Sequence, residues 1–266
     1  MNRRDLTKLL GAAATVTALQ QPGSERARAQ VAATTPSAAG TIGMLVFPGM
    51  TVLDLIGPQQ FLAVAPGRTT HLLWKTREPV VSDSGVPILP TATFAEAPEE
   101  LEVLFVPGGF QGISAVIEDV QALDFVASRG ERATYVTSVC TGALVLGAAG
   151  LLDGYQATTH WAYHDLLPLV GAEPVAARVV EDRNRITGGG VTSGIDFGLT
   201  LLARLAGDDY AQGWQLGTEY DPHPPFDSGA PARANAFIMG EVLKVLGPRV
   251  EAVRAALAGA PGYAGG

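Results

Sequence analysis

The sequence predicts an α/β fold in which a doubly wound, mostly parallel sheet carries helices on both faces. Apolar-rich runs at 41–47, 102–106 and 133–138 are typical of strands that are buried on both faces. Stretches expected to be helical separate these runs and follow the last of them. Because strands and helices alternate throughout, the strands are expected to pair in parallel, with helices packed on either side.

The remaining elements follow from turn residues and helix-start residues. Proline suits the first position of a helix, so Gly57-Pro58 is expected to open a helix over 58–65. Further strands are expected at 71–75 and, as two short strands, within 178–187, with a small hairpin within 79–90. The other expected helices span 113–130, 142–149, 161–170, 193–206, 208–219 and 233–258. We predict a single domain over 41–260, without an internal repeat.

Composition limits the classes of function. The chain has 266 residues, 47% of them apolar, and a net charge of −8, so it can bury a core. An acidic chain without a basic face is not expected to bind nucleic acid. No apolar run is long enough to span a membrane. The single cysteine excludes an intrachain disulfide, and the four histidines lack the spacing of a metal site, so no metal is expected.

The first 29 residues have the order of an export signal. Arg3-Arg4 opens the chain, an apolar run follows at 9–19, and Ala27-Arg28-Ala29 offers a small-x-small cleavage site. This pattern resembles a bacterial twin-arginine signal, which predicts cleavage after Ala29, a linker over 30–40 and a periplasmic or secreted protein. The alternative is an amphipathic N-terminus of a cytosolic protein.

Cys140 is the strongest candidate for a reactive residue. In Thr137-Ser-Val-Cys-Thr-Gly-Ala143 a buried strand reaches the cysteine and turns at once into a helix of small residues. This is the sequence of a nucleophile elbow, which exposes the sulfur. The helix N-terminus there is expected to favour the thiolate. The alternative is a buried cysteine that acts only as a small hydrophobic residue.

Two other strand ends are expected to meet Cys140 in one crevice. Carboxyl ends of parallel strands form the ligand site in this class of sheet. Asp54, in the loop before Pro58, is a candidate to exchange protons with Cys140 or with a substrate; the alternative is a capping or turn residue. Gly108 and Gly109 let the backbone approach a ligand, and their N–H groups, with that of Thr141, are candidates for an oxyanion hole. The alternative is a turn.

His160 and an acidic loop complete the set of candidates. His160 is the natural partner for a cysteine–histidine pair, although a histidine beside Trp161 is often structural. The loop at 219–227 is stiffened by proline and is expected either to cover the crevice or to contact a partner subunit; the alternative is a plain surface loop.

The motifs resemble the PfpI-like branch of the class I glutamine amidotransferase-like superfamily and, within it, the isonitrile hydratases. The likeness extends over about 41–232. The motifs that carry it are Phe47-Pro48-Gly49 through Asp54-Leu55-Ile56-Gly57-Pro58, Val106-Pro107-Gly108-Gly109, Cys140-Thr141-Gly142-Ala143, Gly150-Leu151-Leu152, Ala157-Thr158-Thr159-His160-Trp161, Thr192-Ser193-Gly194-Ile195-Asp196 and Glu219-Tyr220-Asp221-Pro222.

The resemblance implies a flavodoxin-like three-layer sandwich, a homodimer, a small-molecule substrate, and neither a metal nor an organic cofactor. By this resemblance, the functional residues of the isonitrile hydratases correspond to Asp54, Cys140 and Thr141 of this sequence. Many protease-like relatives carry histidine directly after the cysteine and glutamate in the first loop, where this chain has Thr141 and Asp54. The implied reaction adds water to an isonitrile and gives an N-substituted formamide. Either Cys140 attacks while Asp54 supplies the proton, or Asp54 drives direct addition of water.

Two alternatives remain open at the level of sequence. One is another cysteine-dependent hydrolase, an amidase, peptidase or deglycase, that uses Cys140 with His160. The other is a ligand-sensing or redox-sensing domain without enzymatic activity. Relatives of this fold form the N-terminal part of transcription regulators, which are expected to need about 100 further residues for a helix-turn-helix region, whereas this sequence stops at Gly266.

Overall fold

The computed structural model of the chain describes residues 40–265. The predicted signal sequence and the predicted linker up to residue 39 lie outside this range, so both stay predictions. Within it, no helix combines the length and the hydrophobicity that a membrane crossing requires.

Seven strands form the central sheet, and their arrangement confirms the predicted fold class. Their spatial order is β10 (Val179–Asp182), β11 (Arg185–Gly188), β7 (Tyr135–Val139), β6 (Val103–Val106), β1 (Thr41–Leu45), β2 (Thr69–Trp74) and β5 (Ala92–Thr93). All neighbours pair in parallel except β10 and β11, which form an antiparallel edge. The middle strands read as continuous apolar runs because helices cover both of their faces.

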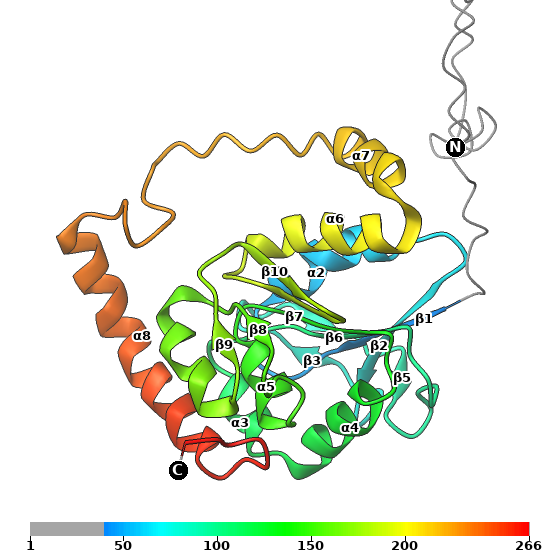
Figure 1. Cartoon of the computed structure of the whole chain (residues 1–266), viewed down its shortest axis with the longest axis horizontal. Helices are drawn as coiled ribbons and strands as arrows, with labels where there is room; N and C mark the ends of the chain where they lie inside the picture. Colours follow the sequence, from blue (N-terminus) through cyan, green and yellow to red (C-terminus); the bar gives the residue numbers. More distant parts are fainter. Residues whose placement is uncertain (1–39, 266) are drawn as a thin grey trace, which may run out of the picture. The chain divides into compact units, whose positions relative to one another are not determined.

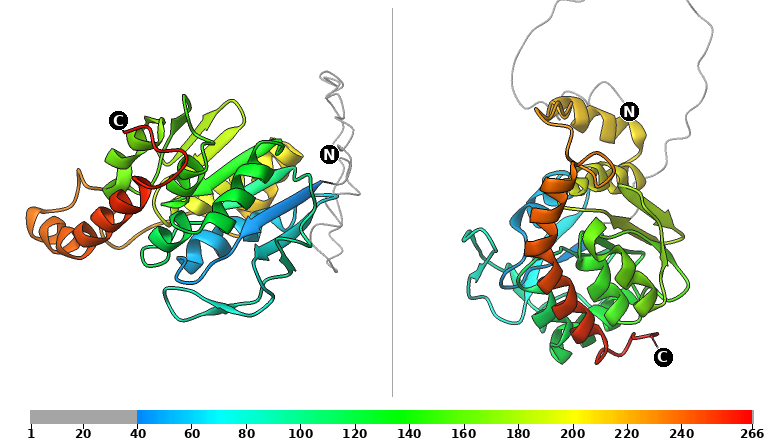
Figure 2. Two further views of the ribbon diagram at one scale, coloured as in Figure 1. Left: turned by 90° about the horizontal axis from the view of Figure 1, so that it is seen from below. Right: turned by 90° about the vertical axis from the view of Figure 1, so that its left-hand side faces the viewer.

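Two layers of helices enclose the sheet (Figures 1 and 2). One layer holds α2 (Val52–Leu62), α6 (Ser193–Ala206) and α7 (Asp208–Gly217). The other holds α3 (Ile113–Ile117), α4 (Val120–Gly130), α5 (Gly142–Ala148), the 3₁₀-helix η1 (Trp161–Val170) and α8 (Ala236–Leu257). Outside the main sheet lie two small two-stranded sheets, formed by the predicted hairpin β3 (Val80–Val81) and β4 (Pro87–Ile88) and by β8 (Gln156–Ala157) and β9 (Glu173–Pro174).

Helix α2 does not begin where the sequence predicts. It begins at Val52, so Pro58 lies inside the helix rather than at its first position. Proline offers no N–H to the helix, but Pro58 packs closely on α6. A Cβ added at Gly194 or at Gly198 would lie 3.1 Å from Pro58. This tertiary packing outweighs the low helix propensity of proline. Asp54 therefore lies in the first turn of a helix and not in a loop.

Three further differences are local. The predicted helix at 113–130 is two helices, because the Asp119 side chain accepts a bond from the Ala122 N–H and starts α4 anew. The stretch at 161–170 is a 3₁₀-helix with Pro168 inside it. Strands β5, β8 and β9 have two residues each, too few to leave a pattern in the sequence.

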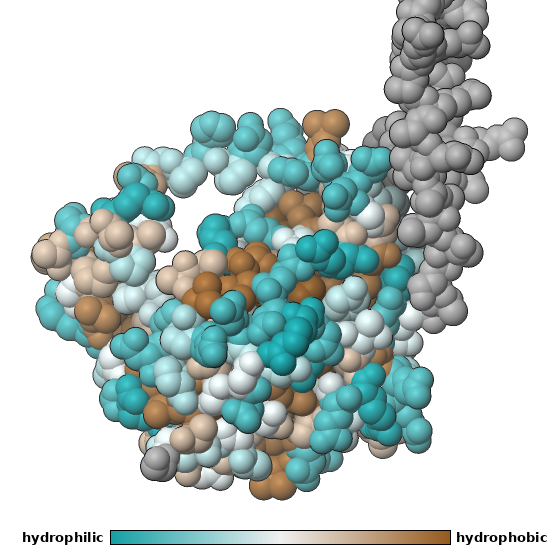
Figure 3. All heavy atoms as spheres, viewed as in Figure 1, coloured by the Kyte–Doolittle hydropathy of each residue, from teal (hydrophilic) through white to brown (hydrophobic). Residues whose placement is uncertain are grey.

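The segment after α7 is unlike the rest of the fold. Residues 218–245, which we call the arm, run as an arch from α7 into the first half of α8 (Figure 1), and Figure 3 shows the arch as a thin row of mostly hydrophilic side chains. Almost every residue of the arm is exposed, including Phe226 (79%) and Phe237 (73%). Only the second half of α8 returns to the core, through Val253 and Leu257.

Candidate active site

Cys140 stands on a sharp turn between β7 and α5. Its φ is +56°, a left-handed conformation that costs energy for any residue other than glycine. The Cys140 N–H donates to the carbonyls of Gly188 and Gly189 at 3.0 and 2.8 Å, and its own carbonyl accepts from the Thr159 hydroxyl at 2.8 Å. A Cβ at Gly142 would lie 2.2 Å from the Val106 oxygen, so the turn needs glycine there. The strand-to-helix turn of the predicted nucleophile elbow is present, but the prediction that the turn exposes the sulfur is wrong, because the surrounding segments bury Cys140 completely.

The structure brings Asp54 directly against Cys140. The side chains of Asp54 and Cys140 lie close enough for each to shift the pKa of the other, and the Gly108 N–H donates to Asp54 Oδ2 at 3.1 Å. Asp54 Oδ1 is buried without a hydrogen-bond partner among the described residues. A Cβ at Gly108 would lie 2.6 Å from that oxygen and 2.7 Å from the Cys140 Cβ. The absent side chain of Gly108 is therefore what allows the two functional groups to meet, as the convergence of strand ends predicts.

The glycine amides have a different role from the one expected. The Gly108 N–H is engaged by Asp54, and the Gly109 N–H donates to the Thr141 hydroxyl at 2.9 Å. In this structure both amides therefore position side chains of the site rather than present two free donors, and an oxyanion hole formed with the Thr141 N–H stays a prediction. Thr141 itself is fully buried, and both its backbone and its hydroxyl lower the pKa of the Cys140 thiol, against the larger effect of burial.

Burial controls the protonation of the pair. Both side chains are fully enclosed, and desolvation raises the pKa of Asp54 to about 7 despite its hydrogen bonds to Cys140 and Gly108; the charge of Asp83 also raises it. Burial, and next the charge of Asp54, raise the pKa of the Cys140 thiol well above its ordinary value. Our expectation that the start of α5 favours a thiolate is wrong for this enclosed pair, because desolvation of the sulfur outweighs it. At neutral pH the site therefore contains a protonated Cys140 thiol next to the Asp54 carboxyl, whose pKa is about 7.

Asp83 reaches the site through Thr51. The Thr51 hydroxyl donates to Asp83 Oδ2 at 2.7 Å, and the Asp83 N–H donates to the Met50 carbonyl at 2.9 Å. These two hydrogen bonds connect the β3–β4 hairpin to residues 50 and 51, which directly precede α2, the helix that carries Asp54. Sequence reasoning did not find Asp83, because nothing in the hairpin's pattern points toward a residue about 30 positions earlier in the chain.

His160 does not pair with the cysteine. Its Nδ1 accepts from the Ala162 N–H at 3.3 Å, and its ring packs edge-on against Phe110 and Tyr163. Burial lowers the pKa of His160 to about 4, so the ring is neutral. In the described part of the chain it forms no hydrogen bond to Cys140 or Asp54. The Tyr163 hydroxyl is buried without a hydrogen-bond partner among residues 40–265, and burial raises its pKa to about 12.

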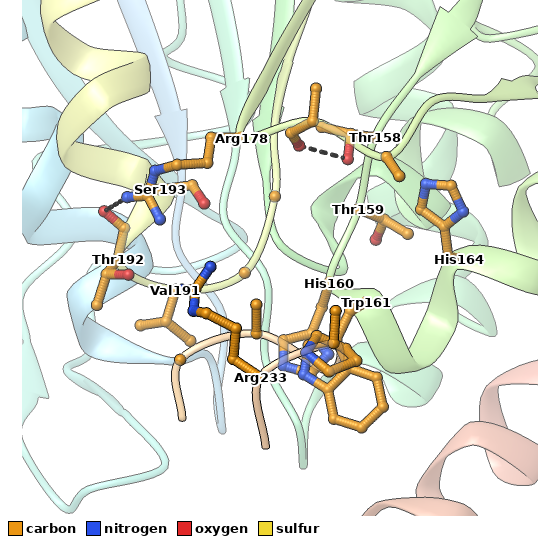
Figure 4. A pocket seen from close by; sticks show the side chains of 18 residues that line it. Thr158, Thr159, His160, Trp161, His164, Arg178, Val191, Thr192, Ser193 and Arg233 are labelled. Atoms are coloured by element: carbon orange, nitrogen blue, oxygen red, sulfur yellow. Dashed lines mark hydrogen bonds between the residues drawn. The ribbon is translucent and has the colours of Figure 1, made fainter. Parts of the chain in front are cut away.

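A pocket of about 790 Å³ lies beside the elbow (Figure 4). Thr159 and Gly189, which both bond to the Cys140 backbone, form part of its wall, and so does His160. Cys140 and Asp54 do not reach its surface. Arg178, Val191, Ser193 and, from the arm, Gly229–Arg233 form the opposite side. Sequence reasoning did not place Gly229–Arg233 at the site, because the arm's return to the pocket leaves no pattern in the sequence. No cluster of metal-binding side chains occurs within residues 40–265.

The fold and the site define a class of protein: a doubly wound α/β domain with a cysteine on a nucleophile elbow and an acid from the first helix. The comparison with protein families agrees. The chain belongs to the DJ-1/PfpI family, whose family model matches residues 41–204.

Individual relatives include an enzyme and regulators. The chain is 54% identical to the isonitrile hydratase of Pseudomonas putida over 210 residues. This match covers 79% of this chain and 91% of that protein. A crystal structure of a THiJ/PfpI family protein from Pseudomonas syringae superposes with a TM-score of 0.82 at 45% identity, covering 89% and 98% of the two chains. The chain is also 33% identical over 179 residues to the transcriptional regulator GbdR of Pseudomonas aeruginosa, covering 63% of this chain but only 47% of the regulator.

Proposed function

We propose that the chain is an isonitrile hydratase, which adds water to R–N≡C and releases the formamide R–NH–CHO. The observation that carries this proposal is the enclosed pair of Asp54 and Cys140, which holds a transferable proton beside a nucleophile without a histidine. The 54% identity to the Pseudomonas putida enzyme supports it.

The pair suits the chemistry of an isonitrile carbon. That carbon carries a lone pair and becomes electrophilic once it is protonated. In the first step the Cys140 proton passes to the Asp54 carboxylate and from there to the carbon, while the sulfur bonds to the same carbon. The carbon–nitrogen triple bond becomes a double bond, and the product is the thioimidate R–N=CH–S–Cys140, which is bonded covalently to the protein. Asp54 returns to its carboxylate form.

Water completes the reaction in the second step. Asp54 takes a proton from water as the oxygen bonds to the thioimidate carbon, and it passes that proton to the nitrogen. The tetrahedral intermediate then loses its sulfur, the hydroxyl proton returns to Cys140 through Asp54, and the formamide leaves. A pKa near 7 suits Asp54 to these transfers, because it accepts and gives up a proton with little cost at neutral pH.

The first step also fixes the expected dependence on pH. It starts from an ionised Asp54, so kcat/KM is expected to rise as pH increases through about 7. An amidase that uses a cysteine–histidine pair would need His160 in contact with the sulfur. The structure instead places this ring on the wall of the pocket, bonded to Ala162.

Two further properties belong to the proposal. We infer that the chain is exported, from the twin-arginine pattern in residues 1–29. We also infer that it forms a homodimer. Support for a dimer comes from the arm, where Phe226, Phe237 and Val245 expose more than half of their surface. Such a group of exposed large apolar side chains is typical of an interface.

The test is the conversion of cyclohexyl isocyanide, with N-cyclohexylformamide measured by chromatography. Cys140→Ser is the informative variant, because a hydroxyl is a far weaker nucleophile than a thiol; we expect a loss of about a thousandfold in kcat/KM. An amide and a thioester serve as alternative substrates. Turnover of the amide or the thioester, but not of the isonitrile, would replace the proposal with a hydrolase.

A further inference from the structure

We propose that the pocket beside the elbow binds the substituent of the isonitrile and that this substituent carries a carboxylate. The substrate is then an isocyano acid, and the product is the corresponding N-formyl acid. This inference rests on the proposed function and adds to it the chemical class of R.

The pocket lining contains cationic side chains and no acidic ones, although the chain as a whole is acidic. The whole chain has a net charge of −8, yet the lining contains two guanidinium groups, Arg178 and Arg233, and no carboxylate. Both histidines of the lining, His160 and His164, add donors or acceptors, and the His164 Nε2 is buried without a hydrogen-bond partner among the described residues. A cavity lined in this way attracts an anion.

Each guanidinium keeps donors for a ligand. Arg178 pairs through Nε with Asp196 and donates from Nη2 to the Thr192 carbonyl at 3.2 Å. Arg233 pairs through Nε with Asp227 at 2.6 Å. Because a guanidinium has five N–H donors, both arginines retain unused Nη hydrogens. Asp227 is 85% exposed, so its attraction for Arg233 is weakened by water.

The start of α6 adds to the positive side of the pocket. Val191, Thr192 and Ser193 belong both to the lining and to the N-terminal end of this 14-residue helix, where the helix dipole is positive. The side chain of the N-cap residue, Thr192, makes no capping bond. In Figure 4, Arg178, Thr192, Ser193 and Arg233 gather on the same side of the pocket, away from His164.

The lining also contains apolar residues, and these define the other part of the substituent. Trp161 and Val191 present the larger apolar surfaces, and residues 230–232 (Ala-Pro-Ala) close the pocket from the arm. An isocyano acid with an apolar side chain matches both surfaces, with its carboxylate on the arginines and its side chain on Trp161.

The shape of an isonitrile explains how such a substrate reaches an enclosed cysteine. The R–N≡C unit is linear and slender, so its terminal carbon needs much less room than R to approach the enclosed cysteine. The pocket wall is one residue away from Cys140, since Gly189 accepts the Cys140 N–H and Thr159 donates to the Cys140 carbonyl. Binding of R in the pocket therefore holds the substrate one residue from Cys140.

The test compares 2-isocyano-3-phenylpropanoate with its methyl ester on the full chain. These probes differ in charge and share the apolar group. We expect kcat/KM to be at least about tenfold higher for the acid, and Arg233→Gln to lower the acid-to-ester ratio by about tenfold or more, as expected for loss of a charged hydrogen bond. Arg204→Gln is the matched control, because Arg204 also pairs with a carboxylate, Glu181, but lies outside the lining.

A binding measurement separates this inference from the proposed reaction. N-formylphenylalanine should inhibit hydration of cyclohexyl isocyanide and raise the melting temperature, whereas its methyl ester should do neither at equal concentration. An equal or slower rate with the acid, together with an Arg233→Gln variant that leaves the ratio unchanged, would overturn the inference while hydration of cyclohexyl isocyanide still upheld the reaction. Failure to hydrate any isonitrile would remove the proposed function itself.

Discussion

The Asp54–Cys140 pair and the arm at 218–245 differ in how the chain holds them. At the pair, backbone groups approach so closely that Gly108 and Gly142 have no room for a side chain, and neither functional group touches solvent. In the arm almost every residue is exposed, and Phe226 and Phe237 have little of the chain to pack against. The first region suits the proposed proton transfer away from water, whereas the second suits the proposed dimer interface.

The largest expected effect is that of Asp54→Asn, which should inactivate the protein while making it more stable at alkaline pH. A carboxyl whose pKa is raised in the folded state binds its proton more tightly there than in the unfolded chain. Its contribution to stability is therefore fully present below about pH 4 and is lost as pH rises to about 7. Removal of the charge should raise the free energy of unfolding at pH 8 by about 4 kcal/mol at most.

Denaturant unfolding at pH 4 and at pH 8 checks this prediction. The gain over wild type should be present at pH 8 and nearly absent at pH 4. An equal change at the two pH values would show that Asp54 is not the buried titrating group that this site requires.

Gly108→Ala should damage the pair through geometry alone. The new Cβ would meet Asp54 Oδ2, the Cys140 Cβ and the Thr141 nitrogen, all within 2.7 Å. Because the Thr141 nitrogen is backbone, it has little freedom to move away. We expect a loss of about 3 kcal/mol in the free energy of unfolding and about a hundredfold in kcat/KM.

Gly213→Ala is the matched control for Gly108→Ala. Gly213 lies in α7, and a Cβ there has no neighbour within 4 Å, so alanine should stabilise the helix slightly. Equal effects of the two variants on unfolding and on turnover would show that the close approach at Gly108 is not needed for the Asp54–Cys140 pair.

In the arm, a smaller effect on activity and a clear effect on assembly are expected. The double variant Phe226→Ser, Phe237→Ser should shift a homodimer toward monomer by about a hundredfold in Kd, since each change removes an apolar contact from the interface. Light scattering coupled to size exclusion measures the shift. Val120→Ser is the control, because Val120 is 72% exposed on α4, outside the arm. A double variant that remains dimeric, or a monomeric wild type, would contradict the proposed interface.

Asp83→Asn should give the smallest change, a shift of the pH profile without loss of the maximal rate. Asp83 raises the pKa of Asp54 through its charge, so removal of that charge should lower this pKa. The rise of kcat/KM with pH should then begin at lower pH. Asparagine can still accept the Thr51 hydrogen bond, so a purely structural role of Asp83 would leave the profile in place.

The contrast between the two regions also shows what the sequence could predict. The apolar runs and the strand-to-helix step at Cys140 are local patterns, and they were sufficient for the parallel sheet and for the elbow with its positive φ. The position of Asp54 was misjudged, because Pro58 looks like a helix start until the packing of α6 against it is known. The protonation of the pair and the occupied glycine amides depend on burial and on contacts between distant segments. The presence of Arg233 in the pocket depends on where the arm returns, which no local pattern encodes.

The most direct test of the central claim is the mass of the chain quenched with acid during turnover of cyclohexyl isocyanide. We expect a population heavier by one isonitrile, with the added mass on the peptide that contains Cys140, and no such species in Cys140→Ser. Rapid turnover with no adduct, together with near-normal activity of Cys140→Ser, would show that Asp54 drives direct addition of water and that Cys140 is not the nucleophile.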